Sequence, residues 1–248
     1  MIAPSHEGES STNKNTFVSP TESQLRRDPT LLEFDNVERI HVDDPRLHTE
    51  KTWEVPFIIT GVSTASTSSL LEEQTLLENF KETEVRTGNR ETLADNGFVN
   101  SLPSSLIAAL NPPSDFSDHP ECGRIVFSPV RELPAELQAH LLPLTSAFPP
   151  SGGGDKKFTL TLAREGFGIG FHKHNAAMFM LVVGRKKWYM GPERVEDDAP
   201  THPGFYTTKS SHKCIQQPGE CLHVPTNWYH EIFNLDPYTA GIQALPDE

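Results

Sequence analysis

The segment that decides the fold begins with Gly-Phe-His-Lys-His at Gly170–His174 and ends with Val-Pro-Thr-Asn-Trp-Tyr-His at Val224–His230. Between these blocks lie an apolar run, Ala176–Val183, then Gly-Arg-Lys-Lys-Trp at Gly184–Trp188 and Pro-Gly-Glu at Pro218–Glu220. An apolar run that ends at a glycine predicts a strand buried on both faces. The blocks together predict short strands separated by turns, as in a β-barrel or sandwich.

Three histidines in this segment predict a metal site. His172 and His174 are one residue apart, so on a strand both side chains point to the same face. His230 lies on a different apolar segment, from which a neighbouring strand can supply a third ligand. Imidazole nitrogens suit Fe(II) and Zn. Either member of the pair alone is more often a structural or surface residue, and it is the combination that favours a metal.

The four blocks, in this order, resemble the C-terminal half of a JmjC domain, the cupin-type double-stranded β-helix of Fe(II)/2-oxoglutarate-dependent oxygenases. The family pattern is His-x-Asp/Glu, a Gly-x-Lys-Arg-Trp-like strand, Pro-Gly-Glu/Asp and Pro-x-x-Trp-x-His. A weaker resemblance extends upstream through Glu54–Gly61 to about Leu32. It implies a mainly β jelly roll with N-terminal flanking helices, and a metal held by His172, His174 and His230.

One position departs from the family pattern. His174 stands where the family has an acid, as in the small JmjC-only branch with a His-x-His motif. An alternative register, with His174 as first ligand and Ala176 at the acid position, fits the distance to Gly184 less well. A neutral third ligand removes one negative charge, and a three-His site also resembles the cupin thiol dioxygenases, which do not use 2-oxoglutarate.

Three functions therefore stay open. The first is an Fe(II)/2-oxoglutarate-dependent oxygenase of the hydroxylase type, acting on a protein side chain or a small molecule. The second is a three-His metal dioxygenase that does not use 2-oxoglutarate. The third is a catalytically silent JmjC-fold binding or scaffold protein, because a fold alone proves no activity.

The resemblance also implies a lysine that binds the distal carboxylate of 2-oxoglutarate. Lys186 is the candidate, and period-two alternation then directs Lys187 to solvent. Thr161 is expected to donate its hydroxyl to the same carboxylate if its face of the strand lines the pocket. Asn234 is expected near the metal-bound histidines, whose second ring N–H usually has a partner. Glu220 is expected in a turn or at the surface.

The remainder of the chain predicts one domain with a tail. Residues 1–28 are polar and predict a disordered tail, so the domain spans 29–248, with its metal-binding barrel core at about 157–245. Helices are predicted over Thr67–Lys81, Ser101–Leu110 and Leu133–Leu142. The glycine-rich connection Phe148–Asp155 is interpreted as a link within the domain.

Charge and cysteine content restrict the partners. The formal net charge of −13 argues against a nucleic-acid-binding surface and against docking on anionic lipid. Three cysteines fit no zinc knuckle or disulfide framework, although a Cys214–Cys221 bridge is conceivable. The N-terminus lacks signal-peptide features. We expect a soluble, cytoplasmic protein, lumenal only if a signal peptide is missing from this sequence; the oligomeric state is not indicated.

Overall fold

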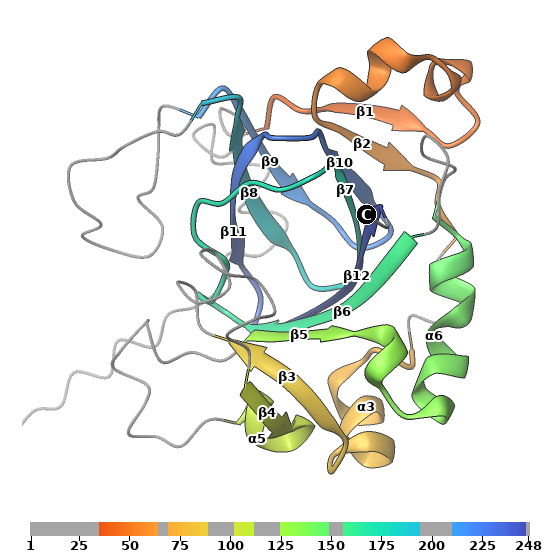
Figure 1. Ribbon diagram of the computed structural model, residues 1–248, viewed down its shortest axis with the longest axis vertical. Helices are drawn as coiled ribbons and strands as arrows, with labels where there is room; N and C mark the ends of the chain where they lie inside the picture. Colours follow the sequence, from red (N-terminus) through yellow and green to blue (C-terminus); the bar gives the residue numbers. More distant parts are fainter. Residues whose placement is uncertain are drawn as a thin grey trace, which may run out of the picture.

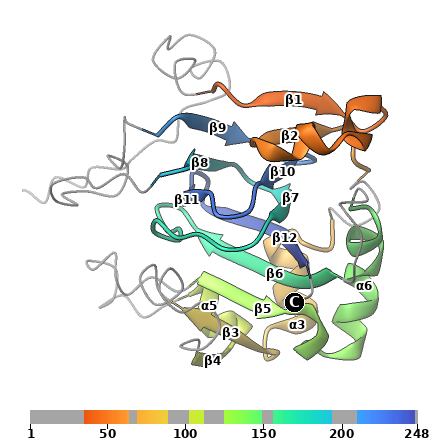
Figure 2. The same ribbon diagram turned by 45° about the horizontal axis from the view of Figure 1, so that its top comes forward.

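Two β-sheets make up the body of the molecule. The computed structural model describes residues 35–63, 69–88, 102–111, 125–148, 156–193 and 210–246, so the tail predicted over residues 1–28 lies outside the described part. The larger sheet has the strand order β1-β2-β10-β7-β12-β6-β5-β3-β4, and the smaller has the order β11-β8-β9. In Figure 1 the sheets curve around a common centre, and Figure 2 shows β1 and β4 at opposite ends of the larger sheet. The expectation of a mainly β jelly roll is confirmed.

The strands are Glu38–His41 (β1), Phe57–Thr60 (β2), Glu84–Gly88 (β3), Leu102–Ser105 (β4), Ile125–Pro129 (β5), Lys156–Arg164 (β6), Ala177–Val183 (β7), Lys186–Gly191 (β8), His212–Gln216 (β9), Cys221–Val224 (β10), Tyr229–Asn234 (β11) and Tyr238–Pro246 (β12). The α-helices are Glu73–Phe80 (α3), Leu106–Leu110 (α5) and Ala135–Ser146 (α6), and the 3-10 helices are Pro45–His48 (η1), Glu50–Glu54 (η2) and Val130–Glu132 (η6). The strand predicted for the apolar run Ala176–Val183 is present as β7 with nearly the predicted bounds.

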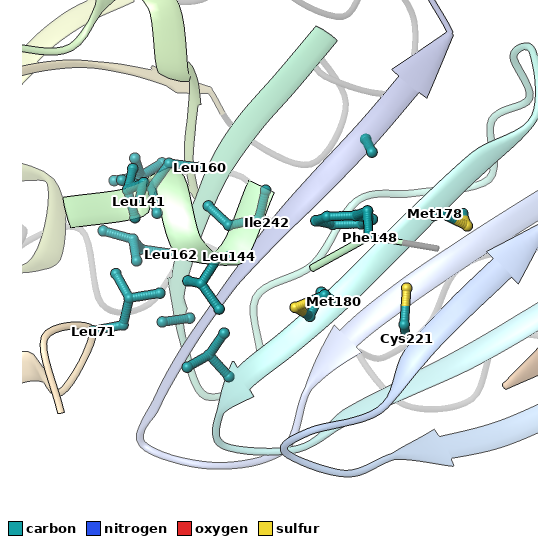
Figure 3. Packing of buried hydrophobic residues seen from close by; sticks show 14 of the residues in the cluster. Leu71, Leu141, Leu144, Phe148, Leu160, Leu162, Met178, Met180, Cys221 and Ile242 are labelled. Carbon is teal, nitrogen blue, oxygen red and sulfur yellow. The ribbon is translucent and has the colours of Figure 1, made fainter. Parts of the chain in front are cut away.

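The larger sheet is buried on both faces. On β6, Leu160 and Leu162 pack with the helices, whereas Ala163 packs in the interior between the two sheets. This alternation follows from the period of two along a strand. Leu141 and Leu144 of α6 belong to the same helix-side cluster and lie against the sheet in Figure 3. Because the helices cover the outer face of the larger sheet, a binding site within the barrel has to lie on the interior face.

The helical predictions upstream are correct only in part. The helix predicted over Thr67–Lys81 begins at Glu73, and the one predicted over Leu133–Leu142 continues to Ser146. The prediction for Ser101–Leu110 was wrong in its first half, which forms β4. A proline is tolerated there because β4 is an edge strand, and the Ser105 hydroxyl then caps α5 by accepting from the Ala108 N–H. Among the described residues, no helix is long and apolar enough to cross a membrane.

A short strand that the sequence analysis missed borders the larger sheet. β1 pairs in parallel with β2, and only Ile40 of its residues is buried. Arg39 donates to Asp35 and, at 2.8 Å, to Glu220 of the Pro-Gly-Glu turn. Glu220 also accepts from the Gln217 N–H. The expectation that Glu220 belongs to a turn was right, but it is a buried ion-pair partner and not a surface residue.

The two described cysteines are free thiols. Cys214 lies on β9 in the smaller sheet and Cys221 on β10 in the larger one, and both are buried. The conceivable bridge between them is therefore not formed. Cys122 lies outside the described residues.

Candidate metal centre

Three histidines come together at one end of the interior. His172 and His230 form an isolated antiparallel bridge, in which each backbone N–H donates to the other residue's carbonyl at 3.1 and 2.9 Å. The ring of His174 lies 4.7 Å from that of His230, centroid to centroid. One nitrogen from each ring lies within 4.8 Å of the other two. One ion bound at ~2.1 Å from each nitrogen requires the nitrogens to lie no more than ~4.2 Å apart, so small adjustments of the rings bring all three within reach of one ion.

Backbone carbonyls fix which ring nitrogen faces the centre. The Nδ1 atoms of His172, His174 and His230 lie 2.7, 2.5 and 2.9 Å from the carbonyl oxygens of Gly170, Asn175 and Trp228, respectively. A carbonyl only accepts, so each Nδ1 must carry hydrogen, and in a neutral ring Nε2 then keeps its lone pair. The Nε2 of His174 is buried without a hydrogen-bond partner. All three rings are thus prepared as Nε2 donors.

The rings are also held in the neutral form that binds metal. Burial lowers the pKa of His172 to about 4, and the neighbouring His174 adds to the effect. Burial lowers the pKa of His174 as well, and it lowers that of His230 well below the usual range. Metal ligands must be deprotonated, so at neutral pH no proton competes for these sites.

The turn before His230 positions the His174 segment. Asn227 adopts a left-handed conformation (φ 62°), and its N–H donates to the His174 carbonyl at 2.9 Å. The Thr226 hydroxyl accepts from the Ala176 N–H at 3.0 Å. Asparagine tolerates this conformation better than most residues. The turn therefore ties the second histidine to the third, although the residues are far apart in sequence.

A glycine allows the backbone beneath the histidines to pack closely. A Cβ added to Gly168 would lie 1.6 Å from the Ile232 carbonyl oxygen. The adjacent Ile169 carbonyl accepts from the Ile232 N–H at 3.0 Å. The segment that precedes His172 therefore packs directly on the β11 backbone at Gly168, where no side chain fits.

Lys186 is buried in the interior, 4 % exposed, with its ammonium 4.5 Å from the centre of the Phe179 ring. None of the ion pairs formed among the described residues involves it. Burial lowers its pKa to about 7. Lys187, the next residue, lies on the opposite face of β8 with its ammonium near the Tyr189 ring. A buried cation of this kind is a natural site for an anion.

Comparison with known proteins gives a consistent fold. No family model matches the chain. The human JmjC domain-containing protein 8 is 29 % identical over 101 residues, which are 36 % of this chain and 38 % of that protein. Its rat counterpart is 27 % identical over 95 residues, or 34 % of this chain and 35 % of that protein. The match thus spans little more than a third of the length of these relatives.

A solved structure extends the similarity to most of the chain. The structure of ycfD from E. coli superimposes with a TM-score of 0.53 and 13 % identity, and covers 82 % of this chain and 53 % of that one. This chain has the JmjC/cupin-like fold. At this identity the similarity shows the architecture of the barrel alone.

Thr161 and Asn234, the two other residues predicted to belong to the site, form hydrogen bonds within the barrel wall. Thr161 is on the interior face of β6, but its hydroxyl donates to the Gly241 carbonyl at 3.3 Å. Asn234 donates to the Phe167 carbonyl and accepts from the Thr239 hydroxyl at 2.6 Å. The expectation that Asn234 supports a histidine was wrong, since backbone carbonyls take all three Nδ1–H groups. Asn234 instead lies directly across from Lys186 in the ladder.

One interior polar group was not predicted from the sequence. Gln243 of β12 is buried, and its Oε1 has no hydrogen-bond partner. It lies across from Phe179, the residue that contacts the Lys186 ammonium. The sequence contained one signal for this group: Gln243 is the one amide side chain in β12, and it follows the mostly apolar residues Ala240–Ile242. Together, Lys186 and Gln243 give the interior wall a polar patch.

Proposed function

We propose that this chain is a non-haem Fe(II)- and 2-oxoglutarate-dependent oxygenase of the hydroxylase type, acting on a protein side chain or a small molecule. The convergence of three Nε2 lone pairs at one end of the barrel carries the proposal. Three protein ligands leave positions on an ion open for other groups. The ycfD protein of Escherichia coli is a ribosomal oxygenase that has been solved with cobalt and 2-oxoglutarate, but the support for this chain comes from its own site.

The histidines would hold the metal, which supplies activation of O₂ when bound. Their fixed tautomers and lowered pKa values mean that no rotation or deprotonation has to precede binding. All three ligands are neutral, so the site gives an ion no charge compensation. A dianionic cosubstrate is therefore electrostatically favoured at this centre.

Lys186 is the proposed partner of the distal carboxylate of that cosubstrate. It lies on β8 four residues before Met190, which pairs with His230. At ~3.3 Å per residue the two backbones are ~13 Å apart along the sheet, a distance that a lysine side chain and a five-carbon diacid span together. Asn234 and Gln243 flank this position as proposed cosubstrate contacts, and Thr161 remains a proposed contact only through its acceptor lone pairs.

An anaerobic Fe(II) titration with and without 2-oxoglutarate tests the proposal. The visible metal-to-ligand charge-transfer band should appear only when both are present. It should be lost in His172→Ala and His230→Ala proteins, and Lys186→Met should weaken 2-oxoglutarate binding while leaving Fe(II) binding intact. His223→Gln is the matched control, because His223 is an equally buried histidine that donates to the Trp53 carbonyl, outside the cluster.

The donor set also favours a second candidate, a three-His dioxygenase that does not use 2-oxoglutarate. In that case Fe(II) binds with the same histidine dependence, but 2-oxoglutarate produces no band and Lys186→Met changes nothing. Failure to bind Fe(II), Co(II) or Zn(II) would overturn both enzymatic functions and favour a non-catalytic scaffold protein. The three results are mutually exclusive.

A further inference from the structure

A second site lies outside the metal centre, in a groove of about 660 Å³. One side of the groove is formed by η6 and α6, and the other by the end of β5 and the start of β6. Arg86 of β3 and Leu245 of β12 complete its lining. None of the residues proposed to bind the metal or the cosubstrate lines it.

The groove is positively charged in an acidic chain. Four cationic residues line it, Arg86, Arg131, Lys156 and Lys157, against a single carboxylate, Glu132, which is ion-paired with Arg86 at 2.5 Å. The chain as a whole carries a formal charge of −13. Arg131 forms no ion pair with any described residue. Burial lowers the pKa of Lys156, so a carboxylate placed in the groove would favour its charged form.

The groove also presents apolar surface to solvent. Leu142 of α6 is 62 % exposed, the most exposed of the large hydrophobic side chains in the described ranges. It lines the groove together with Val130 and Phe158. A small ligand is usually enclosed by its pocket. This groove leaves Leu142 and Arg131 open instead, which suits a segment of a longer chain that is buried on one side only.

Strand register relates one wall of the groove to the start of β7, the strand that follows the histidine pair. Phe158 pairs with Ala244 on β12, and Ala244 pairs with Met178 on β7. Met178 follows His174 by four residues. Two interstrand spacings separate the groove wall from this point, a distance of ~10 Å. Phe158 and Met178 pack on the helix side of the sheet, whereas His230 lies against Trp188 in the interior. A docked chain therefore has to pass around the end of the sheet to reach the histidines, which takes more than the ~3 extended residues that span ~10 Å.

We propose that this groove docks an acidic segment of a protein substrate, with an apolar side chain on Leu142 and carboxylates on the cationic wall. The docked segment would present a neighbouring residue to the histidine cluster; this part of the inference rests on the proposed oxygenase function. The docking itself requires neither metal nor cosubstrate.

Fluorescence anisotropy of a short fluorescein-labelled peptide rich in glutamate and leucine tests the docking on the metal-free full chain. We expect an Arg131→Glu/Lys157→Glu double variant to weaken binding about tenfold or more, as does the loss of ~1.4 kcal/mol. Leu142→Ser should weaken it independently of salt. The matched control is Lys51→Glu/Lys81→Glu, which makes the same change of charge at exposed lysines away from the groove. His172→Ala should leave peptide affinity unchanged.

Equal weakening by both double variants would show a general charge effect and overturn the proposal, as would the absence of peptide binding. If dodecanoate raises the thermal stability of the protein and the peptide does not bind, the proposal is also overturned, and the groove would be a site for a small anionic amphiphile. The Fe(II) titration is independent of these readings. Peptide binding without metal binding would support the docking groove and overturn the proposed oxygenase function. Metal binding without peptide binding would support the oxygenase function and overturn the docking proposal.

Discussion

Hydrogen positions on single side chains govern the chemistry of this site. The spacing of the histidines was enough to predict which residues cluster. The strand on which period two placed His172 and His174 is not formed, however, since His172 makes only an isolated bridge with His230 and His174 lies outside any strand. The partners of their Nδ1–H groups were not predictable, since all three are backbone carbonyls whose orientation depends on local turns. The prediction for Asn234 failed for this reason.

Lys186→Met is expected to stabilise the protein while weakening cosubstrate binding. The folded-state pKa of Lys186, about 7, lies below its ordinary value of 10.5, so between these values the unfolded chain binds more protons. Wild-type stability should therefore rise from pH 7 to pH 10, and this contribution should be absent in the variant. At pH 7 the variant should be more stable by ~1–4 kcal/mol. Urea denaturation at both pH values measures it, and a destabilised variant would show that Lys186 has a structural partner.

His223→Gln should reduce the loss of unfolding free energy that occurs as the pH falls below neutral. Burial lowers the pKa of His223 to about 4 from 6.5, so the unfolded state takes up the proton first as the pH falls through this window. The wild type should lose ~3 kcal/mol through this residue between pH 6.5 and pH 4. The glutamine amide can still donate to the Trp53 carbonyl but does not titrate. Chemical denaturation at the two pH values should show a smaller loss in the variant; equal losses would mean that His223 is not held neutral.

Among the secondary-structure elements, the strands and their turns bring the ligands together. The C-terminal strands could be predicted because apolar runs and the glycine or proline residues that end them are local signals, as in Ala176–Val183, which forms β7 from Ala177 to Val183. β4 could not, because Pro103 is compatible with a helix start and with an edge strand, and only its pairing with Arg86 decides. Long-range pairing leaves no local trace in the sequence.

Gly168→Ala should disrupt the contact between the His172 segment and β11. The added Cβ would meet the Ile232 carbonyl oxygen, which is backbone and cannot rotate away. We expect a loss of ~3 kcal/mol or more, in the range that marks severe overpacking, together with weaker Fe(II) binding. Gly166→Ala is the control: Gly166 has φ +79° but no atom within 4 Å of the added Cβ. It should cost only ~1 kcal/mol and leave metal affinity unchanged, as thermal denaturation and metal titration will show.

For the whole molecule, the helices and the barrel share one apolar cluster. Leu71, just before α3, and Leu76, within α3, lie in the same apolar cluster as Leu162 and Ile242 of the barrel. Hydrophobic periodicity predicted that such helices exist, but not where they dock. The cationic groove was likewise invisible in the sequence, because its lining comes from separate strands and helices that only the tertiary fold brings together.

Leu141→Ala should lower the stability of the entire domain, which remains a prediction for residues 29–248. Leu141 is fully buried between α6 and the sheet, so a cost of ~2–5 kcal/mol is expected. Its neighbour Leu142 is exposed, and Leu142→Ala should change stability by less than ~0.5 kcal/mol. Far-UV and near-UV circular dichroism should report one common transition. Two separate transitions would show that the helical flank and the barrel unfold independently.

The short parallel strand β1 has a consequence for association between copies of the chain. β2 is apolar along its length, Phe57-Ile-Ile-Thr60, and β1 satisfies one side of its backbone while presenting Glu38, Arg39 and His41 to water. Charged, short borders of this kind discourage intermolecular strand addition. A chain shortened to begin after His41 would expose a hydrophobic template for pairing. Such a truncation should form strand-mediated oligomers or fibrils even though its metal ligands are untouched.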